Sequence, residues 1–170
     1  LPLASFIILI FFGKKLGRYA HWISLALIGL MLCITCSLFT KIFQQNTTPI
    51  LSTSIEWFST GSFTVELGFL INNVAVIMLF VVALISSLVH LYSVGYMKGD
   101  PRYSRYFAYL GIFTFSMNGI VLADSIIMMY IFWELVGLSS YLLIGFWFEK
   151  DSAADACKKA FLTNRVGDIG

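Results

Sequence analysis

The sequence predicts an all-α membrane protein that crosses the bilayer several times. Hydrophobic residues make up 59% of the chain and charged residues only 12%, whereas soluble domains have about 45–50% and about 25%. The hydrophobic residues fall into runs close to the roughly 20 residues that a membrane helix needs. Polar loops separate these runs. We therefore expect about six transmembrane helices with one small β-hairpin, on the outward side, between the second and the third.

The first two expected helices are residues 1–12 and 22–39. The first run is short for a span, and the alternative at that length is the hydrophobic segment of a signal peptide. A signal peptide is disfavoured because the basic residues Lys14, Lys15 and Arg18 follow the run instead of preceding it. The chain begins without Met inside an apolar run and stops within a helix-like segment, so we expect an N-terminal fragment of a longer protein.

The second half of the polar loop at residues 41–70 predicts a β-hairpin. Around the polar turn at residues 59–62, hydrophobic residues alternate with other residues at Ile55, Trp57, Phe63, Val65 and Leu67. Alternation of this kind is typical of two strands joined by a turn. We expect an amphipathic hairpin on the membrane surface.

Three more helices are expected at residues 71–92, 107–123 and 126–148, and a sixth begins near Ala156 and is cut short. Only Asp124 and Ser125 join the fourth helix to the fifth, so these two are antiparallel. Either of the two residues can cap the fifth helix.

The fifth expected helix contains one carboxylate, Glu134, close to its middle. A lone acid at that depth costs about 2.5–3.5 kcal/mol on insertion scales, so it should face protein or water. The residues on its helix face are mostly small or hydroxylated and allow close packing, at Tyr130, Gly137, Leu138, Tyr141 and Gly145. Glu134 can relay protons if a cationic neighbour moves; the alternative is a structural glutamate. Trp133 is expected only to pack.

Arg165 and Asp168 lie three residues apart and share a face of the sixth helix. If that helix begins near Ala156, Asp168 lies about 18 Å along it, around mid-membrane depth. One interpretation is a second acid on a proton path; the other is a pair that neutralises itself and locks two helices. Arg165 can pair either with Asp168 or with Glu134 across the helix interface.

The basic residues predict the orientation, because cytoplasmic loops carry an excess of lysine and arginine. Only Lys41 lies in the loops after the second and fourth helices. The loops after the first, third and fifth hold Lys14, Lys15, Arg18, Lys98, Arg102, Arg105, Lys150, Lys158 and Lys159. We expect these three loops in the cytoplasm of a bacterium and the protein in its inner membrane.

The sequence lacks the motifs of several kinds of chemistry. There is no phosphate loop, no dinucleotide fingerprint and no cysteine cluster for an iron–sulfur centre. Cys33 and Cys36 form a CxxC pair without further ligands, so we expect them to pack. A net charge of +2 without a basic stripe argues against nucleic acid. We expect no redox cofactor or metal in this chain.

Three stretches together resemble one family: HLYSVGYM with DPRYSRYF at residues 90–107, FWELVGLSSYLLIGFWF at 132–148, and KAFLTNRVGDIG at 159–170. They are similar to the antiporter-like membrane subunit, called subunit L or chain 5, of respiratory NADH:quinone oxidoreductase (complex I). The resemblance implies a non-redox, proton-pumping subunit. It places Glu134 on the essential glutamate of the fifth helix, and Arg165 and Asp168 on a motif of the sixth.

The resemblance also implies partners and an internal division. FMN, iron–sulfur clusters, NADH and quinone would be bound elsewhere in the complex, and other membrane subunits would be neighbours. Residues 1–106 would hold the first three helices and the hairpin, and residues 107–170 would begin the proton-translocating bundle. The alternative function is a subunit of a multi-subunit cation/proton antiporter or membrane-bound hydrogenase with the same fold. A third reading is a membrane scaffold without ion translocation.

Overall fold

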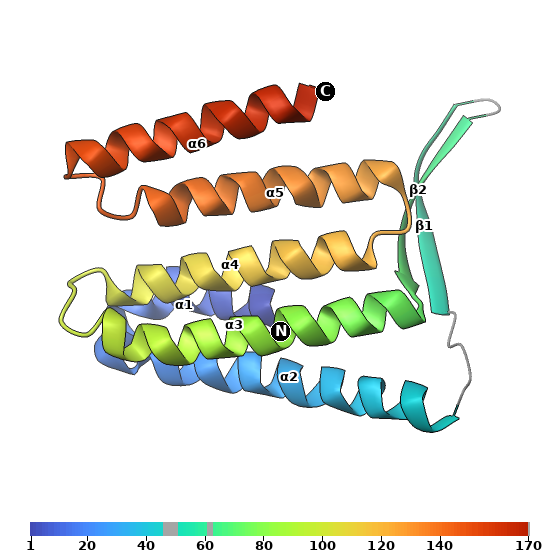
Figure 1. The fold of residues 1–170 in the computed structure, drawn as a ribbon, viewed down its shortest axis with the longest axis horizontal. Coiled ribbons are helices and arrows are strands. Elements are labelled where there is room, and N and C mark those ends of the chain that lie inside the picture. Colours follow the sequence, from blue (N-terminus) through green and yellow to red (C-terminus); the bar gives the residue numbers. More distant parts are fainter. Residues whose placement is uncertain (46–50, 61–62, 170) are drawn as a thin grey trace.

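The computed structural model describes residues 1–45, 51–60 and 63–169. In these ranges the chain forms six α-helices and one two-stranded sheet (Figure 1). A short 3-10 turn, Gly17–Tyr19, separates the first two helices. The elements in chain order are α1 (Pro2–Leu16), α2 (Ala20–Gln45), β1 (Leu51–Thr60), β2 (Phe63–Ile71), α3 (Asn73–Tyr96), α4 (Tyr103–Leu122), α5 (Ile126–Ile144) and α6 (Asp151–Ile169).

The helices lie side by side as a layered bundle with two distinct ends (Figure 1). One end, which we call the loop end, carries the connections α1–α2, α3–α4 and α5–α6. The other, the hairpin end, carries the sheet and the α4–α5 connection. The three loops with most of the basic residues therefore lie at one end, as the sequence predicts.

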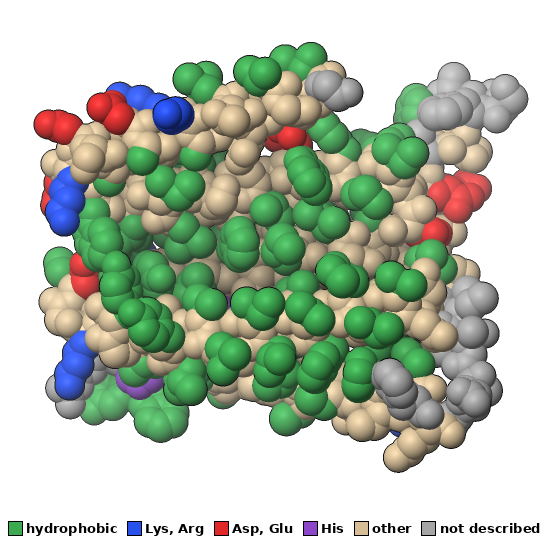
Figure 2. Space-filling view, viewed as in Figure 1, with side chains coloured by type: hydrophobic (Ala, Val, Ile, Leu, Met, Phe, Trp, Pro, Cys, Tyr) green, Lys and Arg blue, Asp and Glu red, His purple; other side chains and the backbone are tan. Residues whose placement is uncertain are grey.

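Three of the helices in the described ranges are long and apolar enough to cross a membrane. They are α2 over Ala20–Ile42, α3, and α5, with mean hydropathies of 2.3, 2.7 and 1.7. Helix α1 offers a shorter apolar stretch, Pro2–Gly13. Figure 2 shows hydrophobic side chains over the middle of one face, with most lysines and arginines at the loop end. This distribution supports an integral membrane protein.

Helix α4 lies at the centre of the bundle and packs against α1, α2, α3 and α5. Phe107 and Ala108 of α4 join Leu9 and Ala20 in a buried apolar cluster. A Cβ on Gly111 would lie 3.2 Å from the carbonyl oxygen of Pro2. Small residues on α4 therefore let the neighbouring backbones come close, as is common between membrane helices.

The helix boundaries differ from the expected ones where capping decides them. Helix α3 begins later than expected because the Asn72 side chain accepts a hydrogen bond from the Ala75 N–H at 2.7 Å. Ser125, not Asp124, caps α5 by accepting from the Met128 N–H at 3.2 Å. Helix α5 ends at Ile144 instead of residue 148, with Gly145 as its C-cap. Helix α6 begins at Asp151, before the expected start at Ala156.

The hairpin is confirmed but longer, and its faces differ from the prediction. The strands are antiparallel, with Ile55 opposite Leu67, and a bulge at Trp57 shifts the register so that Phe58 lies opposite Val65. A bulge adds one residue to one strand and ends simple alternation. Ile55 and Phe58, not Ile55 and Trp57, therefore share a face. Residues 61 and 62 of the expected turn lie outside the described ranges.

Strand β2 is attached to the connection between α4 and α5. Phe69 forms an antiparallel bridge with Ala123, and the Asp124 N–H donates to the Gly68 carbonyl oxygen at 3.1 Å. Gly68 allows this close approach, since a Cβ on it would lie only 3.0 Å from Oδ2 of Asp124. The start of α5 is thereby held by the sheet.

Candidate functional site

The contact with α4 determines which face of α5 meets α6. The Phe132 ring lies directly over Gly119 of α4 and packs edge-on against Phe115, with ring centroids 5.5 Å apart. Glu134 follows two residues later, roughly 200° around a helix of 3.6 residues per turn. It therefore lies on the opposite side of α5, facing α6.

Glu134 is held by one partner from its own helix and one from the next. The Tyr130 hydroxyl donates to Oε1 of Glu134 at 2.7 Å. Nη1 of Arg165, from α6, donates to the same oxygen and forms an ion pair. Of the two predicted partners for Arg165, the structure places Glu134 in contact.

Asp168 does not pair with Arg165, as one prediction had it, but with Trp133. The Trp133 Nε1–H donates to Oδ1 of Asp168 at 3.0 Å. Because α6 begins at Asp151, Asp168 lies about 26 Å along that helix instead of about 18 Å. The antiparallel course of α6 brings it level with Trp133, on the hairpin side of the middle of α5.

Trp133 is the member of the site that sequence reasoning missed. A tryptophan beside the central acid of an apolar helix was expected to pack, yet 56% of Trp133 is exposed and its indole N–H binds a carboxylate. The available signal was its position next to Glu134, combined with the rule that indole N–H groups in apolar surroundings find an acceptor.

A cleft of about 360 Å³ lies beside these groups, between α5 and α6. Arg165 crosses this region, and its guanidinium lies 5.3 Å from the centre of the Phe161 ring. There is room for a side chain at Gly137, because the atom that a Cβ there would meet, Nδ2 of Asn164, is 3.8 Å away. The cleft is lined by Ile131, Glu134, Leu135, Gly137, Leu138, Phe161, Asn164, Arg165 and Asp168.

The close packing predicted for the Glu134 face of α5 is found only toward the loop end, where this face meets α6. Tyr141 meets Phe161 edge-on at 5.6 Å between ring centroids. Near the loop end, a Cβ on Gly145 would lie 3.0 Å from Sγ of Cys157. The two helices are thus close at Gly145 and leave a cleft at Glu134.

Glu134 is only partly enclosed in this arrangement. Glu134 has two hydrogen-bond donors, one of them cationic, and 24% of its side chain is exposed, against 46% for Arg165. Glu134 is therefore less enclosed than expected of a buried glutamate, and the carboxyl can be reached from the cleft.

The cysteines do not add to the site. Cys33 and Cys36 are free; Cys33 is exposed and Cys36 is partly buried. Across the described ranges no group of three or more histidine, cysteine and acidic residues is placed to hold a metal ion.

Two family models match the chain. The model described as "NADH-Ubiquinone oxidoreductase (complex I), chain 5 N-terminus" covers residues 57–107. The model described as "NADH:quinone oxidoreductase/Mrp antiporter, TM" covers residues 123–170 and so includes the cleft.

Curated relatives carry names that agree with these models. The chain is 47% identical over 153 residues to NAD(P)H-quinone oxidoreductase subunit 5, chloroplastic, of Mesostigma viride, covering 90% of this chain and 23% of the relative. It is 53% identical over 116 residues to NAD(P)H-quinone oxidoreductase chain 5 of a Synechocystis strain, covering 68% and 17%. The chain thus spans about a fifth of the length of these relatives.

Two solved structures share the fold. One is the membrane-bound sulfane sulfur reductase, an archaeal respiratory membrane complex, with a TM-score of 0.81 and 17% identity over 99% of this chain and 33% of that one. The other is the Mrp complex from Dietzia, with a TM-score of 0.77 and 23% identity over 99% of this chain and 17% of that one. At these identities the likeness concerns the fold.

Proposed function

Because this chain belongs to the family of antiporter-like membrane subunits that includes complex I chain 5, we propose that it is part of a proton-translocating subunit of NADH:quinone oxidoreductase. Electron transfer from NADH to quinone in other subunits would drive proton movement past Glu134. Residues 1–106 would supply the first helices and the hairpin, and residues 107–170 would begin the translocating bundle. FMN and iron–sulfur clusters would lie in other subunits, and this chain would carry no redox group.

The observation that carries the proposal is the ion pair between Glu134 of α5 and Arg165 of α6 at an open cleft. An acid inside a membrane helix is costly and usually functional. Here its charge is balanced by a residue on a separate helix, so a small relative movement of α5 and α6 changes the balance. In the proposed cycle Glu134 takes up a proton when Arg165 withdraws and releases it when Arg165 returns.

Asp168 is the proposed next group on the path. It lies at the same level of the cleft as Trp133. Trp133 is the residue that precedes Glu134 in the sequence. Arg165 separates from Glu134 more readily if a second carboxylate is near enough to take over its charge, and Asp168 is one turn along α6 from Arg165. Arg165 would then alternate between the two acids.

The experiment replaces Glu134 in the full-length subunit within its assembled complex. Glu134→Gln keeps the shape and the hydrogen-bonding ability but cannot ionise, so it should assemble and pump poorly. Glu134→Asp should keep part of the activity. Protons moved per NADH oxidised are measured in reconstituted vesicles alongside the amount of assembled complex. Glu56→Gln, on the exposed hairpin, is the matched control; normal pumping by assembled Glu134→Gln would leave Glu134 with a structural role.

A multi-subunit cation/proton antiporter is the second candidate function, since the model that matches the cleft also describes Mrp antiporters. The same vesicles separate the two. Proton movement that needs NADH oxidation supports the respiratory subunit, whereas proton movement that needs only a cation gradient supports the antiporter.

The proposed topology has all six helices crossing the membrane, with the loop end in the cytoplasm and the hairpin outside. Basic residues at the loop end support this direction. The proposed location is a bacterial inner membrane; relatives named chloroplastic make a plastid membrane the second candidate. A membrane-impermeant thiol probe should label Ser59→Cys from outside and Lys98→Cys only after the membrane is opened. The reverse pattern would invert the topology.

A further inference from the structure

His90 is an ionisable side chain buried between α3 and α4, and the proposed proton path does not use it. It lies on α3 roughly two turns before the loop end of that helix. Its exposed fraction is 0%, and its ring lies 6.1 Å from that of Phe107 on α4, between centroids. An ionisable residue inside a membrane helix is costly and usually functional. His90 is therefore a candidate for a function separate from that of Glu134.

The hydrogen bonds of His90 determine which ring nitrogen is free to take up a proton. Nδ1 lies 2.8 Å from the Ser86 carbonyl oxygen. A carbonyl oxygen only accepts hydrogen bonds, so Nδ1 carries a hydrogen and donates it. In the neutral ring Nε2 is then an unprotonated acceptor, and it is buried without a hydrogen-bond partner among the described residues. Nε2 is thus the atom at which the ring can accept a hydrogen bond from water or bind a proton.

Polar groups continue from His90 along the interface between α3 and α4. The Ser86 hydroxyl lies 2.7 Å from the Thr114 hydroxyl of α4, and the Asn118 amide donates to the Thr114 carbonyl oxygen at 2.8 Å. Oδ1 of Asn118 is a second buried acceptor without a partner among the described residues. Internal water commonly satisfies such groups, with about three hydrogen bonds for each water molecule. This part of the interface is therefore suited to hold water.

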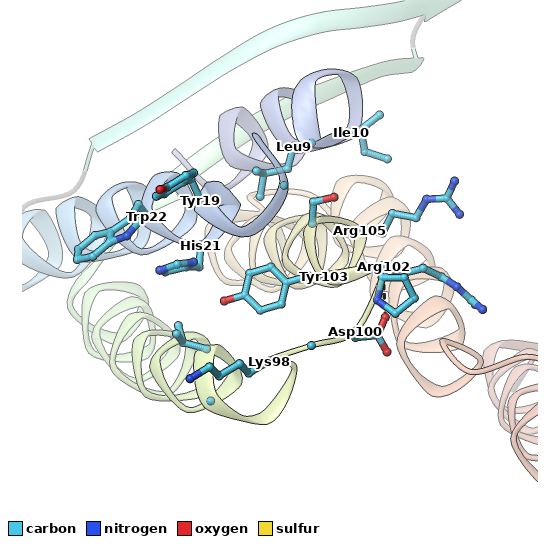
Figure 3. Close-up of a pocket in the computed structure, with 17 residues that line it drawn as sticks. Leu9, Ile10, Tyr19, His21, Trp22, Lys98, Asp100, Arg102, Tyr103 and Arg105 are labelled. Atoms are coloured by element: carbon cyan, nitrogen blue, oxygen red, sulfur yellow. Dashed lines mark hydrogen bonds between the residues drawn. The ribbon is translucent and has the colours of Figure 1, made fainter. Parts of the chain in front are cut away.

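Phe107 separates His90 from a cavity of about 1180 Å³ at the loop end. Leu9, Val94 and Tyr103 line this cavity, and Figure 3 shows the Tyr103 ring in the middle of the lining residues. The same three side chains pack in the apolar cluster that contains Phe107, and the Tyr103 and Phe107 rings lie 5.0 Å apart between centroids. One aromatic ring thus lies between the cavity and His90.

No carboxylate of the described residues fixes the charge of His90, since it forms no ion pair there. The titratable side chains nearest to it on α4 are Tyr103 and Tyr106, whose rings contact that of Phe107. The other titratable groups of α3 and of the described elements packed on it form no hydrogen bond with His90. They are His21, Cys33, Cys36 and Lys41 of α2, Glu66 of β2, Tyr92 and Tyr96 of α3, and Arg105 and Tyr109 of α4. A proton on Nε2 must therefore be stabilised by water.

We propose that Nε2 of His90 is a proton-binding site that exchanges with the loop-end cavity through water molecules between α3 and α4. The water would enter past Phe107, donate to Nε2 and continue to Oδ1 of Asn118. The proton comes from the water of the cavity and returns to it. Histidine is suited to this role because in ordinary surroundings its charge changes near neutral pH. The site goes beyond the proposed translocation past Glu134 and does not depend on it.

The test measures deuterium exchange at the C2–H of individual histidines by mass spectrometry, in the full-length subunit within its assembled complex. This hydrogen exchanges when the ring is protonated and water reaches it, so the rate reports both conditions. Samples are incubated in heavy water at pH values on both sides of the ordinary histidine pKa of about 6.5. His21, which is partly exposed at the same end of the bundle, is the internal reference. The unfolded complex gives the unprotected rate for both residues.

We expect exchange at His90 in the folded complex, a few times slower than at His21, with a rate that rises with pH and levels off above the pKa of the ring. Exchange at His90 only after unfolding, with His21 exchanging in the folded complex, would overturn the proposal. Glu134→Gln should leave exchange at His90 unchanged, even if it abolishes pumping. Loss of exchange at His90 in that variant would contradict a separate site.

Phe107→Leu tests the route from the cavity. The smaller side chain widens the passage, so exchange at His90 should become several-fold faster. The matched control is Phe115→Leu on the same helix, where the ring packs against Phe132 of α5 at 5.5 Å. No acceleration in Phe107→Leu, or equal acceleration in both variants, would overturn the route past Phe107. If Phe107→Leu does not assemble, the comparison of His90 with His21 still decides whether the site exists.

Discussion

Helices α4 and α6 have nearly the same length, 20 and 19 residues, but they are held in different ways. Helix α4 buries seven residues and touches four other helices, whereas α6 buries Cys157 alone among its described residues and packs on α5. Side-chain shape holds α4 in place. Helix α6 is held at its hairpin side by the Arg165–Glu134 and Trp133–Asp168 contacts. The comparison separates a framework held by side-chain packing from an interface held partly by polar contacts.

The largest effect on stability should come from adding one methyl group to the framework where α4 packs against α5. In Gly119→Ala the new Cβ would overlap the Phe132 ring, and overpacking of this kind costs about 1–3 kcal/mol. We expect less assembled complex and a lower unfolding temperature in detergent. The matched control is Gly137→Ala at the α5–α6 cleft, where the nearest atom is 3.8 Å away. Equal losses in the two variants would break the distinction between framework and interface.

At the α5–α6 interface we expect a smaller effect on stability and a measurable effect on proton pumping. Trp133→Phe keeps an aromatic ring and removes the hydrogen bond to Asp168, a contact worth about 1 kcal/mol. We expect normal assembly and fewer protons moved per NADH oxidised, with a milder loss than in Glu134→Gln. Trp22→Phe, at the other end of the molecule, serves as the control. Unchanged pumping by Trp133→Phe would make this contact structural only.

The sequence predicted the helices and the sheet well because hydropathy and alternation depend on local composition. It located α3 and α5, the antiparallel α4–α5 pair and the hairpin. It missed the ends of α5 and α6, since Gly145 stops one helix and Asp151 starts the next only in the context of their packing. It also missed the bulge at Trp57, because one extra residue in a strand leaves no sign in a count of hydrophobic positions.

The residues of the candidate site could be predicted from the sequence, but the contacts between them could be predicted less well. Glu134 stands out as an acid in an apolar run, and Arg165 and Asp168 stand out by their spacing. Which acid receives Arg165 depends on where α6 begins, and a shift of a few residues moves each side chain along the neighbouring helix by several ångströms. The contact of Trp133 with Asp168 depends on the same register. The spacing of residues in the sequence therefore identifies the groups of the site, and the packing of the helices determines which of these groups are in contact.

The packing of α1 on α4 also has a consequence for synthesis of the protein. Gly13 approaches Ser104, and the Cβ that an alanine would add at Gly13 lies 2.9 Å from the Ser104 hydroxyl oxygen, although roughly 90 residues separate the two in the sequence. A ribosome that adds about 5–20 residues per second makes α4 roughly 5–20 s after α1. During this interval the face of α1 around Gly13 has no partner from α4 and must be covered by other groups until α4 arrives.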